Sequence, residues 1–213
     1  MIALVDYGAG NLRSVQNALD ALEVRSTIAS TPEELAGADA IIFPGVGAAA
    51  PAMAALRARD LERPLLEAID RGTPFLGICL GLQLLFDSSA EDGARCLGVF
   101  RGTVDRLPTR EKLPHVGWNT LERVGDHPVL AGLAGEAVYF VHAYVAVPQD
   151  RLLVAAETTY GVPFVSAIAR GRLAGVQFHP ERSGRDGLKL LKNFVQFAGI
   201  GAGHVAQADH SLS

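Results

Sequence analysis

A cysteine flanked by glycines, at a junction between two structural patterns, is the most constraining feature of this chain. The segment Gly77–Gly81 reads Gly-Ile-Cys-Leu-Gly, follows the apolar run Pro74–Leu76 and precedes Leu82–Phe86, which has a helical pattern. Glycines two residues either side of a nucleophile permit a sharp turn in which chain segments come too close for a Cβ. A strand, such a turn and a helix form the cysteine version of a nucleophile elbow, and the helix start favours a thiolate. We interpret Cys79 as a nucleophile; the alternative is a buried structural cysteine.

A second segment supplies the base that a thiol nucleophile needs. The stretch Gly175–Glu181 reads as a strand that ends in His-Pro-Glu. Proline keeps His179 extended, and residues i and i+2 of an extended chain point to the same side. Glu181 is therefore expected to orient one ring nitrogen of His179 while the other faces the thiol. Cys79, His179 and Glu181 are the predicted catalytic residues; the alternative for this segment is a surface His-Pro turn with an unrelated glutamate.

The first half of the chain alternates strand and helix patterns, whereas the second half contains mainly strand patterns with short turns. Strands that alternate with helices indicate βαβ units and a parallel sheet. We predict an α/β fold with a mostly parallel central sheet flanked by helices and extended by antiparallel strands, in one domain over residues 1–198, with a flexible tail over 199–213. The expected strands are Ile2–Asp6, Ala40–Phe43, Phe75–Cys79, Leu97–Leu107, Val138–Val147, Leu152–Glu157, Val165–Arg170 and Leu173–Phe178, and the expected helices are Asn11–Leu22, Ala48–Ala58, Asp60–Arg71 and Asp186–Phe197.

Composition and charge argue against several classes of function. A net charge of −4 gives no electrostatic reason to expect nucleic acid. No apolar stretch approaches the ~18 residues of a membrane-spanning helix, and Met1–Asp6 reads as a first strand rather than a signal peptide. Two cysteines without disulfide spacing, one of them read as an active thiol, indicate a reducing compartment, so we expect a cytoplasmic protein.

Metal and cofactor sites are not expected either. The six histidines show no paired-ligand spacing. The loop Asp6–Asn11 contains two glycines after the first strand, but Arg13 stands where a dinucleotide-binding fingerprint needs its third glycine. We therefore predict no metal and no cofactor.

Three other segments are candidates for the same site or for a contact surface. The loop Pro44–Gly47 ends a strand, and its glycines allow backbone N–H groups to face an oxyanion, with the N–H of Leu80 as a second donor. Gln83 lies one helical turn after Cys79, so its amide either contacts a substrate or is an ordinary polar residue. The only tryptophan, Trp118, is interpreted as core packing or as an interface anchor.

The elbow at Gly77–Gly81 together with His179–Glu181 resembles the class I, or triad-type, glutamine amidotransferases, whose sheet is flavodoxin-like. More narrowly, four further segments resemble the glutaminase subunits of imidazole glycerol phosphate synthases, and the resemblance covers roughly residues 2–198. Arg182 stands where that family often has lysine. The four segments are Asp6–Leu12, Phe43–Gly47, His115–Asn119 and Tyr139–Tyr144.

The resemblance implies that the chain hydrolyses L-glutamine to L-glutamate and ammonia through a cysteine thioester. It further implies that ammonia passes to a TIM-barrel synthase subunit, which makes imidazole glycerol phosphate and aminoimidazole carboxamide ribonucleotide in histidine biosynthesis. A barrel needs ~250 residues of its own, and the 213 residues of this chain leave no room for one. We therefore expect a heterodimer of two separate subunits.

The resemblance also assigns residues to roles. It implies oxyanion donors, substrate contacts and a surface that faces the barrel. The oxyanion hole is either preformed or arranged only after the partner binds. The implied oxyanion donors are Val46, Gly47 and Leu80; the substrate contacts are Gly45, Gln83, His142, Ala143 and Tyr144; and the partner-facing residues are Asn11, Trp118, Tyr139 and Arg182.

Other readings remain open at this point. The chain is alternatively the glutaminase subunit of another amidotransferase, serving pyridoxal phosphate, anthranilate or GMP synthesis. A free-standing thiol hydrolase with the same sheet would need no partner and leaves the Gly-Trp-Asn segment unexplained. A non-catalytic binding subunit would have no need of an intact Cys, His and Glu set.

Overall fold

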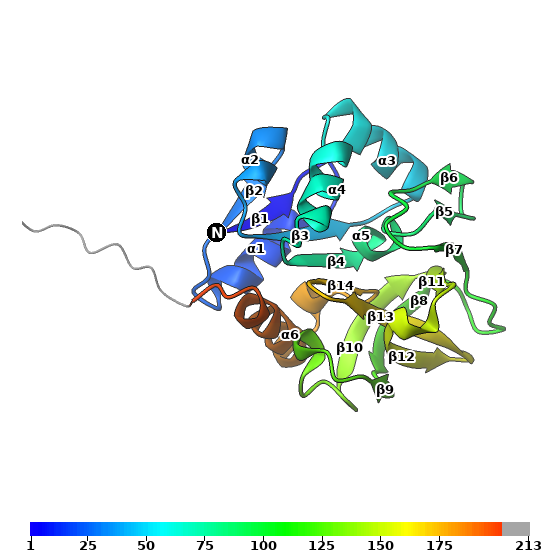
Figure 1. Ribbon diagram of the computed structural model, residues 1–213. Coiled ribbons are helices and arrows are strands. Elements are labelled where there is room, and N and C mark those ends of the chain that lie inside the picture. Colours follow the sequence, from blue (N-terminus) through cyan, green and yellow to red (C-terminus); the bar gives the residue numbers. More distant parts are fainter. Residues whose placement is uncertain (202–213) are drawn as a thin grey trace, which may run out of the picture.

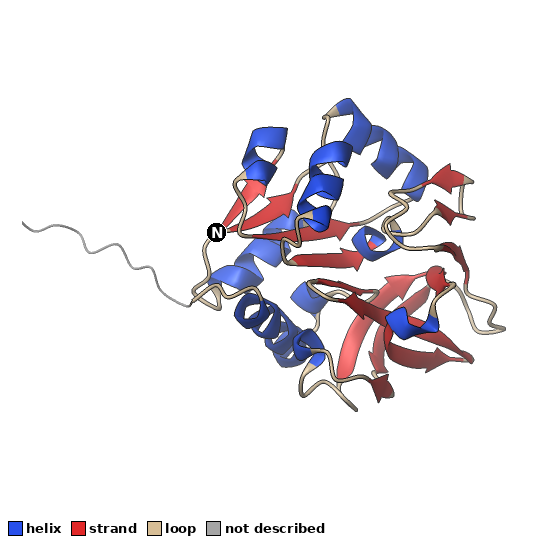
Figure 2. Ribbon diagram, in the orientation of Figure 1, coloured by secondary structure: helices blue, strands red, loops and turns tan. Residues whose placement is uncertain are grey.

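The computed structural model describes residues 1–201 of the chain, and its centre is an eight-stranded sheet (Figure 1 and Figure 2). The strand order is β2-β1-β3-β4-β14-β13-β12-β9. The first five strands run parallel and the last three are joined by antiparallel pairing, which confirms the expected α/β fold class. The strands are β1 (Ile2–Val5), β2 (Ser26–Ala29), β3 (Ala40–Gly45), β4 (Phe75–Cys79), β9 (Arg123–Val124), β12 (Val154–Tyr160), β13 (Val162–Arg170) and β14 (Leu173–Val176).

Helices cover both faces of the parallel half of the sheet. Figure 1 shows α2, α3 and α4 on one face and α1 and α6 on the other. The α-helices are α1 (Leu12–Asp20), α2 (Pro32–Ala36), α3 (Ala49–Ala58), α4 (Glu62–Asp70), α5 (Leu80–Gln83) and α6 (Gly184–Phe197), and the short 3₁₀ turns are η1 (Pro128–Leu130), η2 (Arg151–Leu153) and η3 (Pro180–Arg182).

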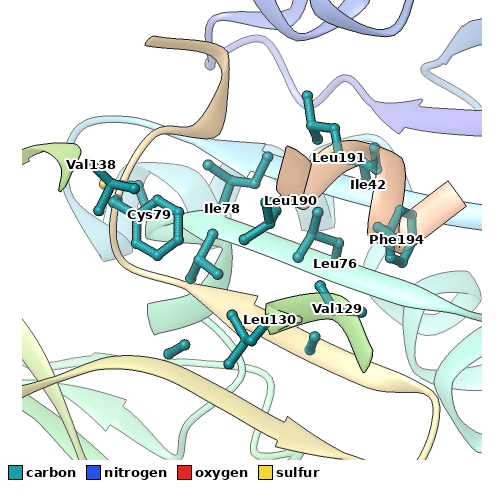
Figure 3. Close-up of a cluster of buried hydrophobic side chains, with 14 of the residues drawn as sticks. Ile42, Leu76, Ile78, Cys79, Val129, Leu130, Val138, Leu190, Leu191 and Phe194 are labelled. Atoms are coloured by element: carbon teal, nitrogen blue, oxygen red, sulfur yellow. The ribbon is translucent and has the colours of Figure 1, made fainter. Parts of the chain in front are cut away.

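Apart from the edge strand β2, the parallel strands are buried on both faces because their alternate side chains enter two different cores. Leu76 and Ile78 of β4 pack with Leu190 of α6 in the cluster that Figure 3 shows. Phe43 and Phe75 belong to the cluster on the opposite face, beneath α3 and α4. Continuous apolar runs in the sequence are the result, and they are what made these strands recognisable.

Two smaller sheets lie beside the main one. One is the antiparallel pair β8–β10, and the other has the order β11-β7-β5-β6. Their strands are β5 (Ser88–Ser89), β6 (Ala94–Arg95), β7 (Gly102–Arg106), β8 (His115–Thr120), β10 (Ala137–His142) and β11 (Tyr144–Pro148).

The single strand expected over Val138–Val147 is wrong, because the chain leaves one sheet and enters another at Ala143. β10 pairs with β8, whereas β11 pairs with β7. The pattern of apolar residues continues across the break, so the sequence contains no local signal for it. β8 was not expected as a strand, since its Gly-Trp-Asn segment resembles a turn; pairing with β10 extends it nonetheless.

The strand expected over Leu97–Leu107 begins only at Gly102. Upstream of it, the N–H groups of Leu97 and Phe100 donate to the carbonyls of Leu84 and Leu85, each over 2.9 Å. Those bonds tie the segment to the chain that follows the elbow, so it cannot extend a sheet.

β2 and α2 were also not anticipated. The separation into a domain over 1–198 and a tail over 199–213 remains a prediction, because residues 202–213 lie outside the described part of the chain.

The site-forming edge of the sheet is set by strand register. β4 lies between β3 and β14, and all three strands are parallel, so their carboxyl ends meet. Gly45 is opposite Cys79 on one side, and Val176 is opposite Ile78 on the other. The segments that follow these strands therefore surround Cys79, at the place where open α/β sheets bind ligands.

We expect Leu190→Ala to lower the free energy of unfolding by about 2–5 kcal/mol, because Leu190 is fully buried between α6 and the sheet. Urea unfolding would measure the change. Leu152→Ala is the matched control, since Leu152 is 90% exposed, and its effect should stay within about 0.5 kcal/mol. Equal effects of the two substitutions would contradict the described core.

Candidate active site

The backbone at Cys79 has the geometry of a strained elbow. Cys79 is the last residue of β4, with a φ of 54° and a ψ of −109°, and side chains rarely occupy that region. A Cβ at Gly81 would lie 1.8 Å from the carbonyl oxygen of Phe43, and a Cβ at Gly77 would lie 2.8 Å from the carbonyl oxygen of Gly81. Neither contact is possible, so both glycines are required for the turn that presents the sulfur.

The helix after the elbow differs from the expected one. The helical pattern covers Leu82–Phe86, but α5 begins at Leu80, directly after Cys79, and ends at Gln83. The next carbonyls do not continue the helix, because they accept hydrogen bonds from the loop at 97–100. The start of the helix is thus placed beside the sulfur, and only one helical turn follows.

His179 and Glu181 form a buried pair. Nδ1 of His179 lies 2.8 Å from Oε1 of Glu181, and the side chains are 4% and 2% exposed. The backbone N–H of His179 donates to the carbonyl of Tyr139 over 2.9 Å. Because the carboxylate accepts, Nδ1 carries a proton and Nε2 is left for another partner. Nε2 is buried and makes no hydrogen bond of ordinary geometry with any described residue.

The Cys79 thiol lies close enough to His179 to change its titration. Burial lowers the pKa of His179, but the nearby Cys79 sulfur, the hydrogen bond with Glu181 and the negative charges of both groups outweigh it and raise the pKa to about 10. At neutral pH the imidazole is therefore protonated. The structure brings together the three residues expected to be catalytic, and it gives the site a cationic ring beside the sulfur.

A cavity of about 360 Å³ opens above the sulfur, within the size range of small-molecule sites. It contains both Cys79 and His179, the three expected oxyanion donors and all but one of the expected substrate contacts. The exception is Gly45, where a Cβ would lie 2.6 Å from the hydroxyl of Tyr7 and which is packed beneath the wall. The lining residues are Val46, Gly47, Cys79, Leu80, Gln83, Glu91, Pro114, Val141, His142, Ala143, Tyr144 and His179.

Gln83 is fixed by hydrogen bonds that determine which of its atoms faces the cavity. Its Nε2 donates to the carbonyl of Tyr144 and to Oε1 of Gln177, over 3.0 Å each. A carbonyl can only accept, so the amide orientation is settled by its partners. Oε1 of Gln83 accepts no hydrogen bond from a described residue and is left as an acceptor.

Glu91 adds a carboxylate to the cavity wall that sequence reasoning missed. Burial, and then the charge of Asp92, raise its pKa. The residue lies in a turn after β5, where no spacing rule or motif marks it, so only the folded chain reveals its place.

His142 lines the cavity as a neutral ring. Its Nδ1 lies 3.1 Å from the carbonyl of Tyr144 and its Nε2 lies 3.2 Å from Nδ1 of His115. The first contact requires a proton on Nδ1, so Nε2 accepts from His115. Burial and the charges of His115 and His179 lower the pKa of His142 to about 3. Because both of its ring nitrogens have protein partners, His142 forms part of the cavity wall and does not act as a proton donor to the substrate.

One of the expected oxyanion donors lies near a buried tyrosine. Burial, together with the negative charge of Cys79, raises the pKa of Tyr7, and the backbone N–H of Val46 partly opposes this rise. The contact does not reach ordinary hydrogen-bond geometry, because the Tyr7 hydroxyl is buried without a hydrogen-bond partner among the described residues. The Val46 amide thus lies near Tyr7 without a hydrogen bond to it.

Three of the four expected partner-facing residues lie together on one exposed side. Trp118 of β8 is 58% exposed, and it is paired in register with Tyr139 of β10, whose ring centroid lies 6.2 Å away. The guanidinium of Arg182 lies 4.3 Å from the centre of the Tyr139 ring, within the range of a cation–π contact. Val116, two residues before Trp118, is 56% exposed on the same side of the strand.

Asn11 lies at the start of α1, which packs against η3. It is the N-cap by position, but its side chain makes no cap hydrogen bond. Its Oδ1 instead accepts from the hydroxyl of Ser14 over 2.8 Å.

Residues 1–201 show neither a cluster of metal ligands nor a membrane-spanning helix. That part of the chain contains no group of three or more His, Cys, Asp or Glu side chains placed to hold a metal ion. None of its helices is both long and apolar enough to span a bilayer. His204 and His210 lie outside the described residues.

Comparison with known proteins agrees with the geometry. The family model "Glutamine amidotransferase class-I" matches residues 3–197. "Imidazole glycerol phosphate synthase subunit HisH" of Dehalococcoides mccartyi strain CBDB1 is 50% identical over 200 residues, covering 93% of this chain and 98% of that protein. The HisH subunit of Moorella thermoacetica is 48% identical over 208 residues, covering 95% of this chain and 99% of that protein.

More distant similarities concern a fused protein and the fold. "Imidazole glycerol phosphate synthase hisHF, chloroplastic" of Arabidopsis thaliana is 46% identical over 92% of this chain but only 34% of that protein. A crystal structure of a glutamine amidotransferase superposes with a TM-score of 0.74 at 22% identity, covering 93% of this chain and 100% of that one. This last similarity concerns the fold alone.

The elbow, the Glu–His pair and the matched family model define a class I glutamine amidotransferase, and the chain belongs to that family. Within it, the chain belongs with the HisH subunits of imidazole glycerol phosphate synthase, which confirms the expected family and the expected glutamine-hydrolysing activity.

The raised pKa of His179 predicts how stability depends on pH. An unfolded histidine titrates near 6.5 and the folded one near 10, so the folded protein keeps a proton that the unfolded chain loses over that interval. This stabilisation is complete below pH 6.5 and is lost as the pH rises to about 10. We expect urea unfolding at a series of pH values to show a steeper fall in unfolding free energy for the wild type than for His179→Asn. Equal slopes would contradict the assignment.

Proposed function

We propose that this chain is the glutaminase subunit of an imidazole glycerol phosphate synthase. It hydrolyses L-glutamine and delivers ammonia to a TIM-barrel synthase subunit that forms imidazole glycerol phosphate and aminoimidazole carboxamide ribonucleotide in histidine biosynthesis, in the cytoplasm. The observation that carries this proposal is the placement of Cys79 beside the buried His179–Glu181 pair on one cavity. Kinship with the HisH subunits supports the choice of pathway.

The first half of the reaction forms a thioester. The Cys79 thiolate attacks the side-chain carbonyl carbon of glutamine, and the carbon–oxygen π pair moves onto the oxygen. Collapse of this intermediate breaks the carbon–nitrogen bond, while the proton on Nε2 of His179 goes to the leaving nitrogen. Ammonia departs, and a γ-glutamyl thioester and a neutral imidazole remain.

The second half returns the enzyme to its starting state. Nε2 of His179 takes a proton from water as the water oxygen attacks the thioester carbonyl. The carbon–sulfur bond then breaks, which restores the thiolate and the imidazolium and releases the product with a protonated side-chain carboxyl group. That group gives its proton to ammonia or to solvent and leaves glutamate. Glu181 holds the ring in one orientation throughout, through its hydrogen bond to Nδ1.

The backbone N–H groups of Val46, Gly47 and Leu80 are the proposed oxyanion donors. The three residues line the cavity around the sulfur, and such donors typically account for ~10²–10³ in rate. In the described state the Val46 amide lies near the buried Tyr7 hydroxyl. A turn of the peptide at Val46 would aim this N–H at the substrate, and we propose that partner binding favours that turn.

Recognition of glutamine follows from the polar atoms on the wall. An α-ammonium group needs acceptors, and the free Oε1 of Gln83 and the carboxylate of Glu91 supply them. The Ala143–Tyr144 backbone lines the same cavity beside Gln83. This arrangement favours a free amino acid over an amide that lacks the ammonium group.

The proposed docking surface consists of Asn11, Val116, Trp118, Tyr139 and Arg182. An exposed tryptophan beside a tyrosine and an arginine has the composition of an interface anchor. The Arabidopsis relative supports a two-part enzyme. The 200 matched residues make up 34% of its length, so the unmatched two thirds are longer than the ~250 residues of a barrel. We propose a heterodimer with the barrel subunit.

We expect Cys79→Ser to abolish glutamine-dependent synthesis in the complex while activity with added ammonium salt stays within about twofold of wild type. Glutamine-dependent synthesis should be lost because a serine hydroxyl is not ionised at neutral pH and is a weak nucleophile. Ammonia-dependent synthesis should remain because the barrel does not use the Cys79 sulfur. Product formation with each nitrogen source would be measured. Loss of both activities would contradict the assigned role.

We expect Trp118→Ala to weaken association with the synthase subunit about tenfold or more, because a central tryptophan anchor typically contributes this much. Titration calorimetry would measure the affinity, and thermal unfolding would show whether the fold is intact. Leu152→Ala, another exposed apolar position, should leave the affinity unchanged. An unchanged affinity with a destabilised fold would indicate that Trp118 serves packing.

A further inference from the structure

Gln177 is a buried polar residue beside the nucleophile. It follows β14, and the parallel register that pairs Val176 with Ile78 brings it next to Cys79. Its exposure is 0%, and its backbone N–H donates to the carbonyl of Ser166 over 2.9 Å. A fully buried amide must find partners for its polar atoms or destabilise the fold.

The partners of Gln177 leave one orientation for its side chain. Nε2 of Gln83 is a donor, because it contacts the carbonyl of Tyr144, and it lies 3.0 Å from Gln177. The atom of Gln177 that faces Gln83 is therefore the oxygen. Its nitrogen lies on the other side, 3.5 Å from Sγ of Cys79, so an N–H group points at the reacting sulfur.

We propose that Gln177 is a positioning residue for the nucleophile, whose amide N–H holds the Cys79 sulfur in its anionic form and in the rotamer that faces His179. A donor at an ionised acceptor makes one of the stronger hydrogen bonds in proteins, and a buried site excludes the water that would otherwise replace it. This inference rests on the proposed function only in taking Cys79 as the nucleophile.

Gln177 also joins the sulfur to the wall that recognises substrate. Gln83 lines the cavity and donates to Gln177, which donates to Cys79. Gln177 itself does not line the cavity. Its loss should therefore slow the chemical step and leave substrate binding nearly unchanged, which separates its role from that of Gln83.

Alkylation of Cys79 by iodoacetamide at neutral pH tests the inference on the full-length chain. Gln177→Glu keeps an acceptor for Gln83 but replaces the donor, and Gln177→Met removes both polar atoms. We expect both variants to lower the alkylation rate of Cys79 about tenfold or more, the size typical of a hydrogen bond to a charged group. Peptide mass spectrometry would follow Cys79 and Cys96 separately.

Two internal controls identify general damage to the fold. Ser166 lies on the strand next to Gln177, and its buried hydroxyl has no hydrogen-bond partner among the described residues. In Ser166→Ala, Cys79 should therefore be alkylated at the wild-type rate. Burial raises the pKa of Cys96 to about 11, so this thiol should stay slow unless the fold loosens. A drop at Cys79 with slow Cys96 supports the inference, and a wild-type rate at Cys79 in either Gln177 variant overturns it.

Kinetics in the complex with the synthase subunit give a second measurement. We expect kcat for glutamine hydrolysis to fall about tenfold in Gln177→Met, with KM within about twofold of wild type. A raised KM with an unchanged kcat would overturn the inference, because Gln177 would then act only by supporting Gln83. If wild-type Cys79 reacts no faster than Cys96, the proposed nucleophile itself is wrong, and that result is distinct from a failure of Gln177.

Discussion

The parallel pairing of β14 with β4 is the constraint on which the site depends. It brings His179 next to a cysteine that lies 100 positions earlier in the sequence, and it places Gln177 in register beside that cysteine. The elbow alone would present a sulfur without a base. Since β14 is held by β4 on one side and by β13 on the other, the backbone carrying the histidine has little freedom to move away. Precision at the catalytic centre is thus a property of the sheet.

Charge in this site is buried only where it has partners. His179 has Glu181 on one ring nitrogen and lies close to the thiol on the other side, and the sulfur accepts from Gln177. The two remaining imidazoles near the cavity, His115 and His142, both have lowered pKa values because they are buried without a carboxylate. One histidine is therefore cationic at neutral pH and two are neutral, and this difference follows from the presence or absence of an acidic partner.

The sequence was informative where local chemistry demands particular residues. Glycine beside Cys79 and proline after His179 are required by backbone geometry, so both motifs could be interpreted without a structure. The break at Ala143 could not, because the apolar pattern runs through it and the choice of sheet depends on distant strands. The roles of Glu91 and Gln177 could not be predicted for a related reason. A turn places Glu91 on the cavity wall and strand register places Gln177 beside the sulfur, and neither arrangement produces a sequence motif.

The two-stranded ladder of β8 and β10 has two chemically different sides. Val116 and Trp118 point outward, while His115 points inward and meets His142 of the neighbouring strand. Because side chains alternate along a strand, the exposed set of β8 positions is distinct from the set that includes His115, which contacts the cavity-lining residue His142. Amidotransferase subunits could therefore diverge toward different synthases by changing one alternate set of residues, with the glutamine-binding wall inherited intact.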